Sequence, residues 1–168
     1  MGIRTAVVGA SGYSGGELLR LLAAHPSLDV GALVAGGHAG RRLGELHPQL
    51  VSLADRVLLD SSAPELADCE LVFLALPHGA TPQVVANLAP DARVVDIGAD
   101  YRLADAADWQ RWYGGEHPGT WVYGLPELPG ARAAIAGATR IANPGCYATA
   151  VQLALAPLLA AELVAPTD

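Results

Sequence analysis

A cysteine late in the chain stands where a thiol could act as a nucleophile. Cys146 follows the turn Asn143-Pro144-Gly145 and precedes an apolar run with a helical pattern. The segment predicts that Cys146 lies in or near the first helical turn, where the helix dipole favours a thiolate over a thiol. The unpaired N–H groups of that turn are also suited to an oxyanion formed when sulfur attacks a carbonyl. A purely structural cysteine is the alternative.

A glycine-rich loop near the start of the chain could bind phosphate. It follows the buried-strand pattern 3–8 and precedes a helical pattern over 17–24. Dinucleotide-binding units begin in this way, because glycines let the backbone approach a pyrophosphate at the helix N-terminus. The predicted cofactor-binding residues are Gly9, Ser11, Gly12, Tyr13, Ser14 and Gly15. Their spacing differs from the common GxGxxG, and a tight turn without a ligand is the alternative.

The residues after the second predicted strand, 28–34, bear on which dinucleotide fits. NAD sites place Asp or Glu at this strand end to bind the ribose 2′-hydroxyl. Asp29 comes too early in the strand, whereas Arg41 and Arg42 follow its end by a few residues. Guanidinium groups without a carboxylate suit a 2′-phosphate, so we predict NADP and cofactor contacts from both arginines. Ordinary solvated arginines are the alternative.

His78 is the histidine placed best for a role in binding. It follows the clearest strand pattern, 71–76, and open α/β sheets bind ligands at the carboxyl ends of their strands. We predict that His78 lines the cofactor cleft, with stabilisation of its own turn as the alternative. The five histidines show no metal-ligand spacing, so no metal site is predicted. Cys69 precedes the same strand and is predicted to pack in the core.

The elements that position these residues alternate between strand and helix. Further strand patterns cover 57–59 and 94–97 and include Ile141. Helical patterns cover 64–68, 80–88, 105–113 and the run from 146, whereas 36–56 looks like a polar connection and 101–140 is less regular. This order predicts an α/β fold with a doubly wound, Rossmann-like, mostly parallel sheet.

The composition narrows the class of protein further. The 168 residues are 52% hydrophobic and 16% charged, which excludes a disordered chain, and the net charge is −7. The acidity excludes a basic nucleic-acid footprint, and no uninterrupted 18-residue apolar stretch predicts a membrane span. Two cysteines are too few for a disulfide framework. Because no signal peptide is evident at the start, we expect a cytoplasmic location.

Together the motifs resemble the N-acetyl-gamma-glutamyl-phosphate reductase family along the whole chain. Besides the glycine loop, the stretches that carry the resemblance are 76–79 (LPHG), 98–103 (GADYRL), 123–127 (YGLPE) and 141–157. The last stretch, centred on Pro144-Gly145-Cys146-Tyr147, is the most specific of them.

The resemblance implies a reaction and roles for several residues. Cys146 would form a thioester from N-acetyl-glutamyl 5-phosphate, and NADPH would reduce it to N-acetyl-glutamate 5-semialdehyde for arginine biosynthesis. Arg102 and Asn143 would contact the acyl-phosphate substrate, because an arginine fork suits a phosphate or carboxylate. A surface ion pair of Arg102 with Asp100 or Asp105 is the alternative for that side chain. The full-length family member is expected to be a homo-oligomer.

The resemblance also sets expectations about domains. Family members carry a second domain of similar size, which supplies a general acid/base histidine, after the cysteine helix. We therefore expect an NADP-binding domain at 1–145, and at 146–168 the cysteine helix that opens a truncated catalytic domain. Such a partial chain is expected to bind NADP and to turn over little substrate.

Two other interpretations remain open. Aminoadipate-phosphate reductase and aspartate-semialdehyde dehydrogenase perform the same chemistry, although Pro-Gly-Cys-Tyr disfavours the aspartate enzyme. The other interpretation is an inert NADP-binding module, whose Cys146 would be alkylated slowly, whereas a nucleophile would react fast near neutral pH.

Overall fold

A parallel sheet forms the centre of residues 2–165, the part of the chain that the computed structural model describes. Its six strands are β1 (Ile3–Val8), β2 (Leu28–Val34), β3 (Leu71–Leu74), β4 (Arg93–Asp96), β5 (Val122–Tyr123) and β6 (Arg140–Ala142). They lie in the order β2-β1-β3-β4-β6-β5, and every neighbouring pair is parallel. The predicted α/β class is therefore confirmed, with a sheet that is wholly parallel.

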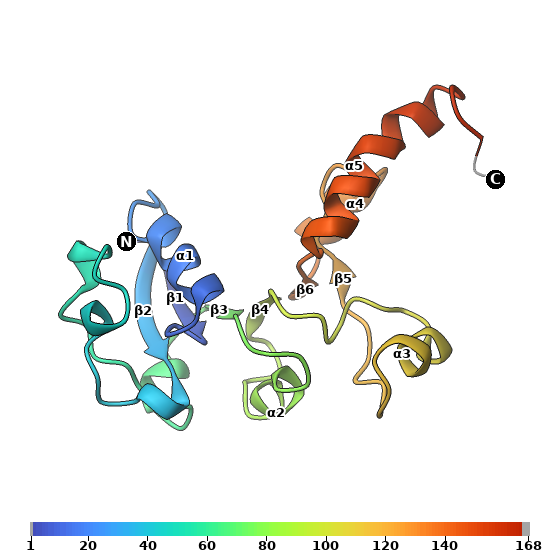
Figure 1. Ribbon diagram of the computed structural model, residues 1–168. Coiled ribbons are helices and arrows are strands. Elements are labelled where there is room, and N and C mark those ends of the chain that lie inside the picture. Colours follow the sequence, from blue (N-terminus) through green and yellow to red (C-terminus); the bar gives the residue numbers. More distant parts are fainter. Residues whose placement is uncertain (1, 166–168) are drawn as a thin grey trace.

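The helices cover both faces of the sheet. They are α1 (Tyr13–Leu22), α2 (Thr81–Val85), α3 (Ala106–Trp112), α4 (Ala131–Ala136) and α5 (Cys146–Ala160). In Figure 1, α1, α4 and α5 lie above the sheet, and α2 and α3 lie below it. This arrangement confirms the doubly wound architecture that the alternation of patterns predicts.

Two apolar clusters form the core, one on each face. Val7 and Leu33 pack with Leu19 of α1, whereas Ala6 and Val8 belong to the cluster on the other face. Successive side chains of a strand point to opposite faces, so a strand buried on both sides reads as an unbroken apolar run. β1 and β3 have this pattern because both lie inside the sheet and their side chains pack alternately in the two clusters.

The connection from β2 to β3 differs from the expected polar loop. It contains 3₁₀ turns at Gly36–His38, Leu43–Glu45 and Val51–Leu53. Leu43, Leu50 and Leu58 are buried in the cluster that includes α1. The expected strand 57–59 is reduced to isolated bridges with Arg42 and Val34. The segment thus contributes core side chains, although no long regular element carries them.

Other element bounds differ from those expected. The first helix begins at Tyr13, four residues before its expected start, so Tyr13, Ser14 and Gly15 belong to the helix and not to the loop. β5 and α4 were not expected, because a two-residue strand and a six-residue, alanine-rich helix leave little periodic pattern.

The strand order creates a point where a ligand can enter. From β1 the chain forms β2 on one side and then returns to form β3 on the other side. The segments that follow β1 and β3 therefore diverge at the carboxyl edge of the sheet. Open α/β sheets bind ligands at such a switch point.

Helix α5 is apolar along most of its length, yet none of its residues is buried. Tyr147, Val151 and Leu155 are exposed, and Figure 1 shows α5 rising away from the sheet. Its 15 residues are followed by turns, and no helix within residues 2–165 is long and apolar enough to cross a membrane. The apolar surface of α5 is thus uncovered in the described part of the chain.

Candidate active site

The glycine loop after β1 is shaped by close backbone contacts. Gly9 has a φ of 92°, and a side chain there would overlap the carbonyl oxygen of Ala75. A side chain at Gly15 would overlap the carbonyl oxygen of Gly9. Gly12 is the N-cap of α1 and offers no side chain to the first-turn N–H groups. These groups are open to an anion, so the loop has the shape and polarity of a phosphate cradle.

A buried histidine supports this loop from within. His47 Nε2 lies 3.1 Å from the carbonyl oxygen of Ala10 and donates a hydrogen bond to it. The imidazole also packs against Gly16, where any side chain would overlap the ring. Three glycines, Gly9, Gly15 and Gly16, and one histidine therefore fix the path of the loop. This role of His47 could not be predicted from the sequence, because the contact joins residues that are far apart along the chain.

The two arginines expected near the 2′-phosphate lie on the surface after β2. Arg41 Nε is 3.0 Å from Glu45 Oε2, and Arg42 Nη1 is 2.8 Å from Asp55 Oδ1. Both side chains are largely exposed, so their pairing with carboxylates leaves them free to exchange partners. Asp29 lies near the start of β2, where it accepts a hydrogen bond from the N–H of Gly2. It is therefore away from the carboxyl edge of the sheet.

His78 follows β3 and pairs with a buried carboxylate. Its Nδ1 is 2.6 Å from Oδ1 of Asp100, which also accepts hydrogen bonds from the N–H groups of Gly79 and Thr81. The imidazole packs against the rings of Trp109 and Tyr113 in or after α3. The turn is thus fixed by Asp100, while part of the His78 ring remains exposed at the sheet edge.

A second buried carboxylate stands at the end of β4. Asp96 Oδ1 accepts hydrogen bonds from the N–H of Gly98 and the hydroxyl of Thr81, whereas Oδ2 has no partner among the described residues. Burial raises the pKa of Asp96, hydrogen bonding from Gly98 lowers it, and the nearby Asp100 raises it further. The net direction is upward, which favours the neutral form of the Asp96 carboxyl group.

Cys146 is the first residue of α5, as predicted, and its thiol side chain is exposed. Gly145 is the N-cap and offers no side chain to the first-turn N–H groups. The turn is anchored to the sheet because the N–H of Asn143 donates to the carbonyl oxygen of Asp96 over 2.8 Å. An exposed thiol in this position can attack a carbonyl carbon, and the uncapped N–H groups beside it can stabilise the resulting oxyanion. Cys69, in contrast, is buried in the core, as expected.

The alternative ion pair of Arg102 with Asp100 or Asp105 is wrong. Asp100 pairs with His78, and Asp105 caps α3 by accepting hydrogen bonds from the first-turn N–H groups. Arg102 instead donates to the backbone carbonyl oxygens of Ile97 and Asn143. The side chain therefore bridges the segment after β4 and the turn before the cysteine.

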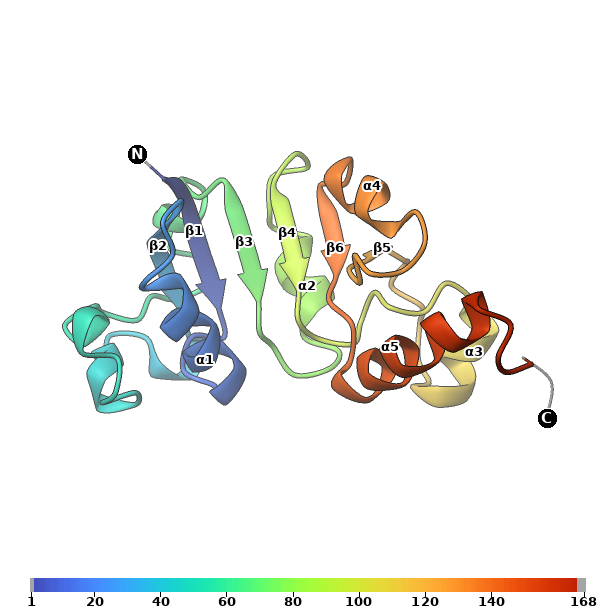
Figure 2. The same ribbon diagram turned by 90° about the horizontal axis from the view of Figure 1, so that it is seen from above.

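The predicted site residues share one edge of the sheet. The glycine loop follows β1, His78 follows β3, Arg102 comes after β4, and Cys146 follows β6. Figure 2 shows the start of α1 and the start of α5 at this same end of the strands. Three strand spacings separate β1 from β6, a span of about 14 Å. Arg41 and Arg42 follow β2 on the far side of the loop.

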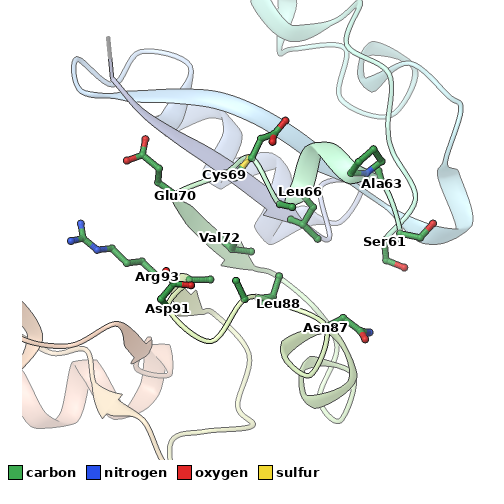
Figure 3. A pocket seen from close by; sticks show the side chains of 16 residues that line it. Ser61, Ala63, Leu66, Cys69, Glu70, Val72, Asn87, Leu88, Asp91 and Arg93 are labelled. Carbon is green, nitrogen blue, oxygen red and sulfur yellow. The ribbon is translucent and has the colours of Figure 1, made fainter.

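A cavity of about 870 Å³ lies elsewhere. Figure 3 shows it between the 3₁₀ turn Pro64–Leu66 and the segment after α2, with Cys69 and Val72 in its wall. Its lining residues fall within 61–72 and 87–93 and mostly precede β3 and β4, so the cavity lies toward the amino ends of the strands. Within residues 2–165, no three His, Cys, Asp or Glu side chains are grouped as a metal site would require.

Comparison with known proteins defines the class first. Residues 4–138 match the family described as "Semialdehyde dehydrogenase, NAD binding domain", and the chain belongs to this family. Within it, the chain is 61% identical to the N-acetyl-gamma-glutamyl-phosphate reductases of Acidothermus cellulolyticus, over 168 residues, and Thermobifida fusca, over 166 residues. These matches confirm the resemblance that the motifs indicate.

The coverage of these matches is unequal. They include 100% and 99% of this chain but 49% and 48% of the two reductases, so the chain spans about half the length of the curated relatives it matches. Among solved structures, aspartate semialdehyde dehydrogenase from Candida albicans, with NADP, matches with a TM-score of 0.64. This match covers 95% of the present chain and 47% of the Candida albicans enzyme. The match to aspartate semialdehyde dehydrogenase II from Vibrio cholerae, complexed with ASA, has a TM-score of 0.61. It covers 96% of the present chain and 47% of the Vibrio cholerae enzyme. Both are 18% identical to this chain, which supports the shared fold alone.

Proposed function

We propose that the chain is the cofactor-binding, nucleophile-bearing part of an NADPH-dependent acyl-phosphate reductase. The observation that carries the proposal is the exposed thiol of Cys146 at the uncapped start of α5, on the same sheet edge as the glycine loop. The 61% identity to N-acetyl-gamma-glutamyl-phosphate reductases supports N-acetyl-glutamyl 5-phosphate as the substrate, and therefore a step of arginine biosynthesis.

The loop residues fit a dinucleotide. Side chains at Gly9 and Gly15 would fill the cradle, and the N–H groups at the start of α1 have no capping side chain. The backbone from Ser11 to Gly15 would therefore hold the pyrophosphate, and Arg41 and Arg42 would turn toward the 2′-phosphate. His78 would face the cofactor from the neighbouring strand. NADPH, when bound, would supply the hydride that reduces the acyl group.

The thiol would perform the group transfer. After its thiol has lost its proton to solvent, Sγ of Cys146 attacks the carbonyl carbon of the acyl phosphate, a C–S bond forms, and the C–O bond to phosphate breaks. The bonding electrons leave with inorganic phosphate, and the acyl group remains on the protein as a thioester. The first-turn N–H groups of α5 would stabilise the oxyanion that forms during the attack. Asn143, in the turn before the helix, and Arg102, from the segment after β4, would contact the substrate.

We further propose the division into an NADP-binding domain at 1–145 and a cysteine helix at 146–168. The curated relatives are about twice as long, so their remaining half would supply the other substrate contacts and proton transfers. A protein ending at Asp168 would then bind NADPH but turn over little substrate. We infer that the full-length enzyme acts in the cytoplasm as a homo-oligomer.

The reverse reaction tests the proposal in the full-length protein. The measurement is phosphate-dependent formation of NADPH from N-acetyl-glutamate 5-semialdehyde. Cys146→Ala should abolish it, whereas Cys69→Ala should retain it, because Cys69 is packed in the core. Activity that survives Cys146→Ala would refute the thioester mechanism.

A substrate panel separates the remaining alternatives. Equal or greater activity with aspartate semialdehyde or with the aminoadipate semialdehyde would change the assigned substrate but not the chemistry. NADPH binding combined with slow alkylation of Cys146 and no turnover would instead identify an inert binding module.

A further inference from the structure

Arg102 connects the end of β4 with the turn that precedes the cysteine. Its Nε donates to the carbonyl oxygen of Asn143 over 2.8 Å, and its Nη2 donates to the carbonyl oxygen of Ile97 over 2.9 Å. Both bonds are partly buried, and the planar guanidinium makes them at the same time. The side chain that the family resemblance assigns to the substrate is therefore already engaged with the protein backbone.

The turn itself is built around this guanidinium. A side chain at Gly145 would place its Cβ 3.0 Å from Nη1 of Arg102, closer than ordinary packing allows. The N–H of Asn143 donates to the carbonyl oxygen of Asp96 at the end of β4. Asn143 is thus held through its N–H by the sheet and through its carbonyl by Arg102. The next residues, Pro144 and Gly145, lead directly into Cys146.

We propose that Arg102 is a positioning residue that fixes where α5 begins and therefore where the Cys146 thiol lies. The proposal has a structural part, the bridge itself, and a chemical part, the reactivity of the thiol, which rests on the proposed function. A lysine cannot replace the bridge, because its ammonium is a point charge without the fork that reaches both carbonyls.

Two variants separate positioning from charge and from substrate binding. Arg102→Lys keeps the charge but loses the fork, and Arg102→Gln loses both. Arg111→Gln is the matched control, because Arg111 lies in α3 and stacks on Trp112. Gly145→Ala provides an independent variant that presses on Nη1 without altering Arg102.

The first measurement is amide hydrogen exchange of Asn143 and Thr149, whose N–H groups donate to the carbonyl oxygens of Asp96 and Gly145, in the protein without substrate. Loss of a charge-assisted hydrogen bond should accelerate exchange about tenfold or more in Arg102→Lys and Arg102→Gln. Gly145→Ala should give a smaller increase, and Arg111→Gln should give none. Unchanged exchange in Arg102→Lys would overturn the positioning role. If Arg102→Gln fails to fold, Arg102→Lys and Gly145→Ala still decide the question.

The second measurement is the rate at which iodoacetamide alkylates Cys146, again without substrate. Positioning predicts that Arg102→Lys and Arg102→Gln change this rate by a similar factor, about fivefold or more. If only Arg102→Gln changes the rate, charge alone is responsible. If neither variant does and only the KM for the acyl phosphate rises, Arg102 is a substrate ligand. Either result contradicts positioning.

The proposed function and the positioning role of Arg102 can be refuted independently. Slow alkylation of Cys146 in the unaltered protein, together with accelerated exchange in Arg102→Lys, would refute the proposed function and retain the bridge. Fast alkylation that no Arg102 variant alters would retain the proposed function and refute positioning.

Discussion

Nδ1 of His78 lies 2.6 Å from Oδ1 of Asp100, which ties the turn after β3 to the segment after β4. The carboxylate is 1% exposed and also accepts two backbone hydrogen bonds, whereas the imidazole is partly open to solvent. The pair therefore holds the predicted cofactor-facing ring on a fixed support, with one side available to a ligand.

Replacement of Asp100 tests the value of this support. Asp100→Asn keeps the shape of the side chain but removes the charge that accepts from His78, Gly79 and Thr81. We expect a loss of about 1–3 kcal/mol in the free energy of unfolding and a roughly threefold to tenfold weaker affinity for NADPH. Urea unfolding and fluorescence titration measure the two effects. Asp91→Asn, at an exposed site, should change neither; equal behaviour of the two variants would contradict this interpretation.

The glycine loop offers a matched pair of substitutions. Gly15→Ala places a methyl group onto the Gly9 carbonyl and should cost about 1–3 kcal/mol of stability. Gly12→Ala meets no atom closer than 3.5 Å and should cost less than about 1 kcal/mol. Thermal unfolding without cofactor measures the difference. If Gly12→Ala is stable but binds NADPH more weakly, the pyrophosphate lies beside residue 12. If Gly15→Ala is as stable as Gly12→Ala, the loop is flexible enough to accommodate the added methyl group.

The positive charges of Arg41 and Arg42, which follow β2, should make the protein prefer NADPH to NADH. Loss of both guanidinium groups in Arg41→Ala/Arg42→Ala should raise the Kd for NADPH roughly tenfold to a hundredfold and leave that for NADH nearly unchanged. Arg20→Ala, which removes an exposed ion pair on α1, is the control. Equal losses for both cofactors, or none, would assign the two arginines to the solvated surface. Isothermal titration with each dinucleotide provides the comparison.

Asp96 should make stability depend on pH. Because its pKa is raised in the fold, the neutral form stabilises the protein fully below the ordinary aspartate pKa of 3.8, and this contribution is lost as pH rises through the raised value. Each pKa unit corresponds to about 1.4 kcal/mol. The free energy of unfolding of the unaltered protein should therefore fall relative to Asp96→Asn from pH 4 upward. Parallel pH profiles of the two proteins in urea titrations would contradict a raised pKa.

Much of the fold follows from local pattern. The strands β1, β2 and β3 have apolar runs that only a sheet buried on both faces can accommodate. The start of α1 could not be predicted from periodicity, because Tyr13 is exposed and Gly15 and Gly16 are poor helix formers. Gly15 and Gly16 are accepted there because larger residues would overlap the Gly9 carbonyl and the His47 ring.

The positions of Cys146 and of the glycine loop were predictable from the sequence, whereas the residues that support them were less so. Cys146 follows a Pro-Gly turn, a signal that lies within a few residues. Asp100 and Arg102 act through partners distant in sequence, His78 and Asn143, so only the three-dimensional arrangement reveals their contacts. A polar residue soon after a strand end is the available signal, and Asp100, close behind β4, carries it.

The contact between Gly9 and the Ala75 carbonyl has a consequence for affinity. The N–H groups of Gly9 and Ala10 donate to Val34, so the start of the loop is bonded to β2, and the N–H of Ala75 donates to Val8 at the end of β1. An incoming dinucleotide meets a rigid receptor and need not freeze a mobile segment. Binding should accordingly proceed without the entropy loss that accompanies loop ordering, and most of the contact energy should appear as affinity.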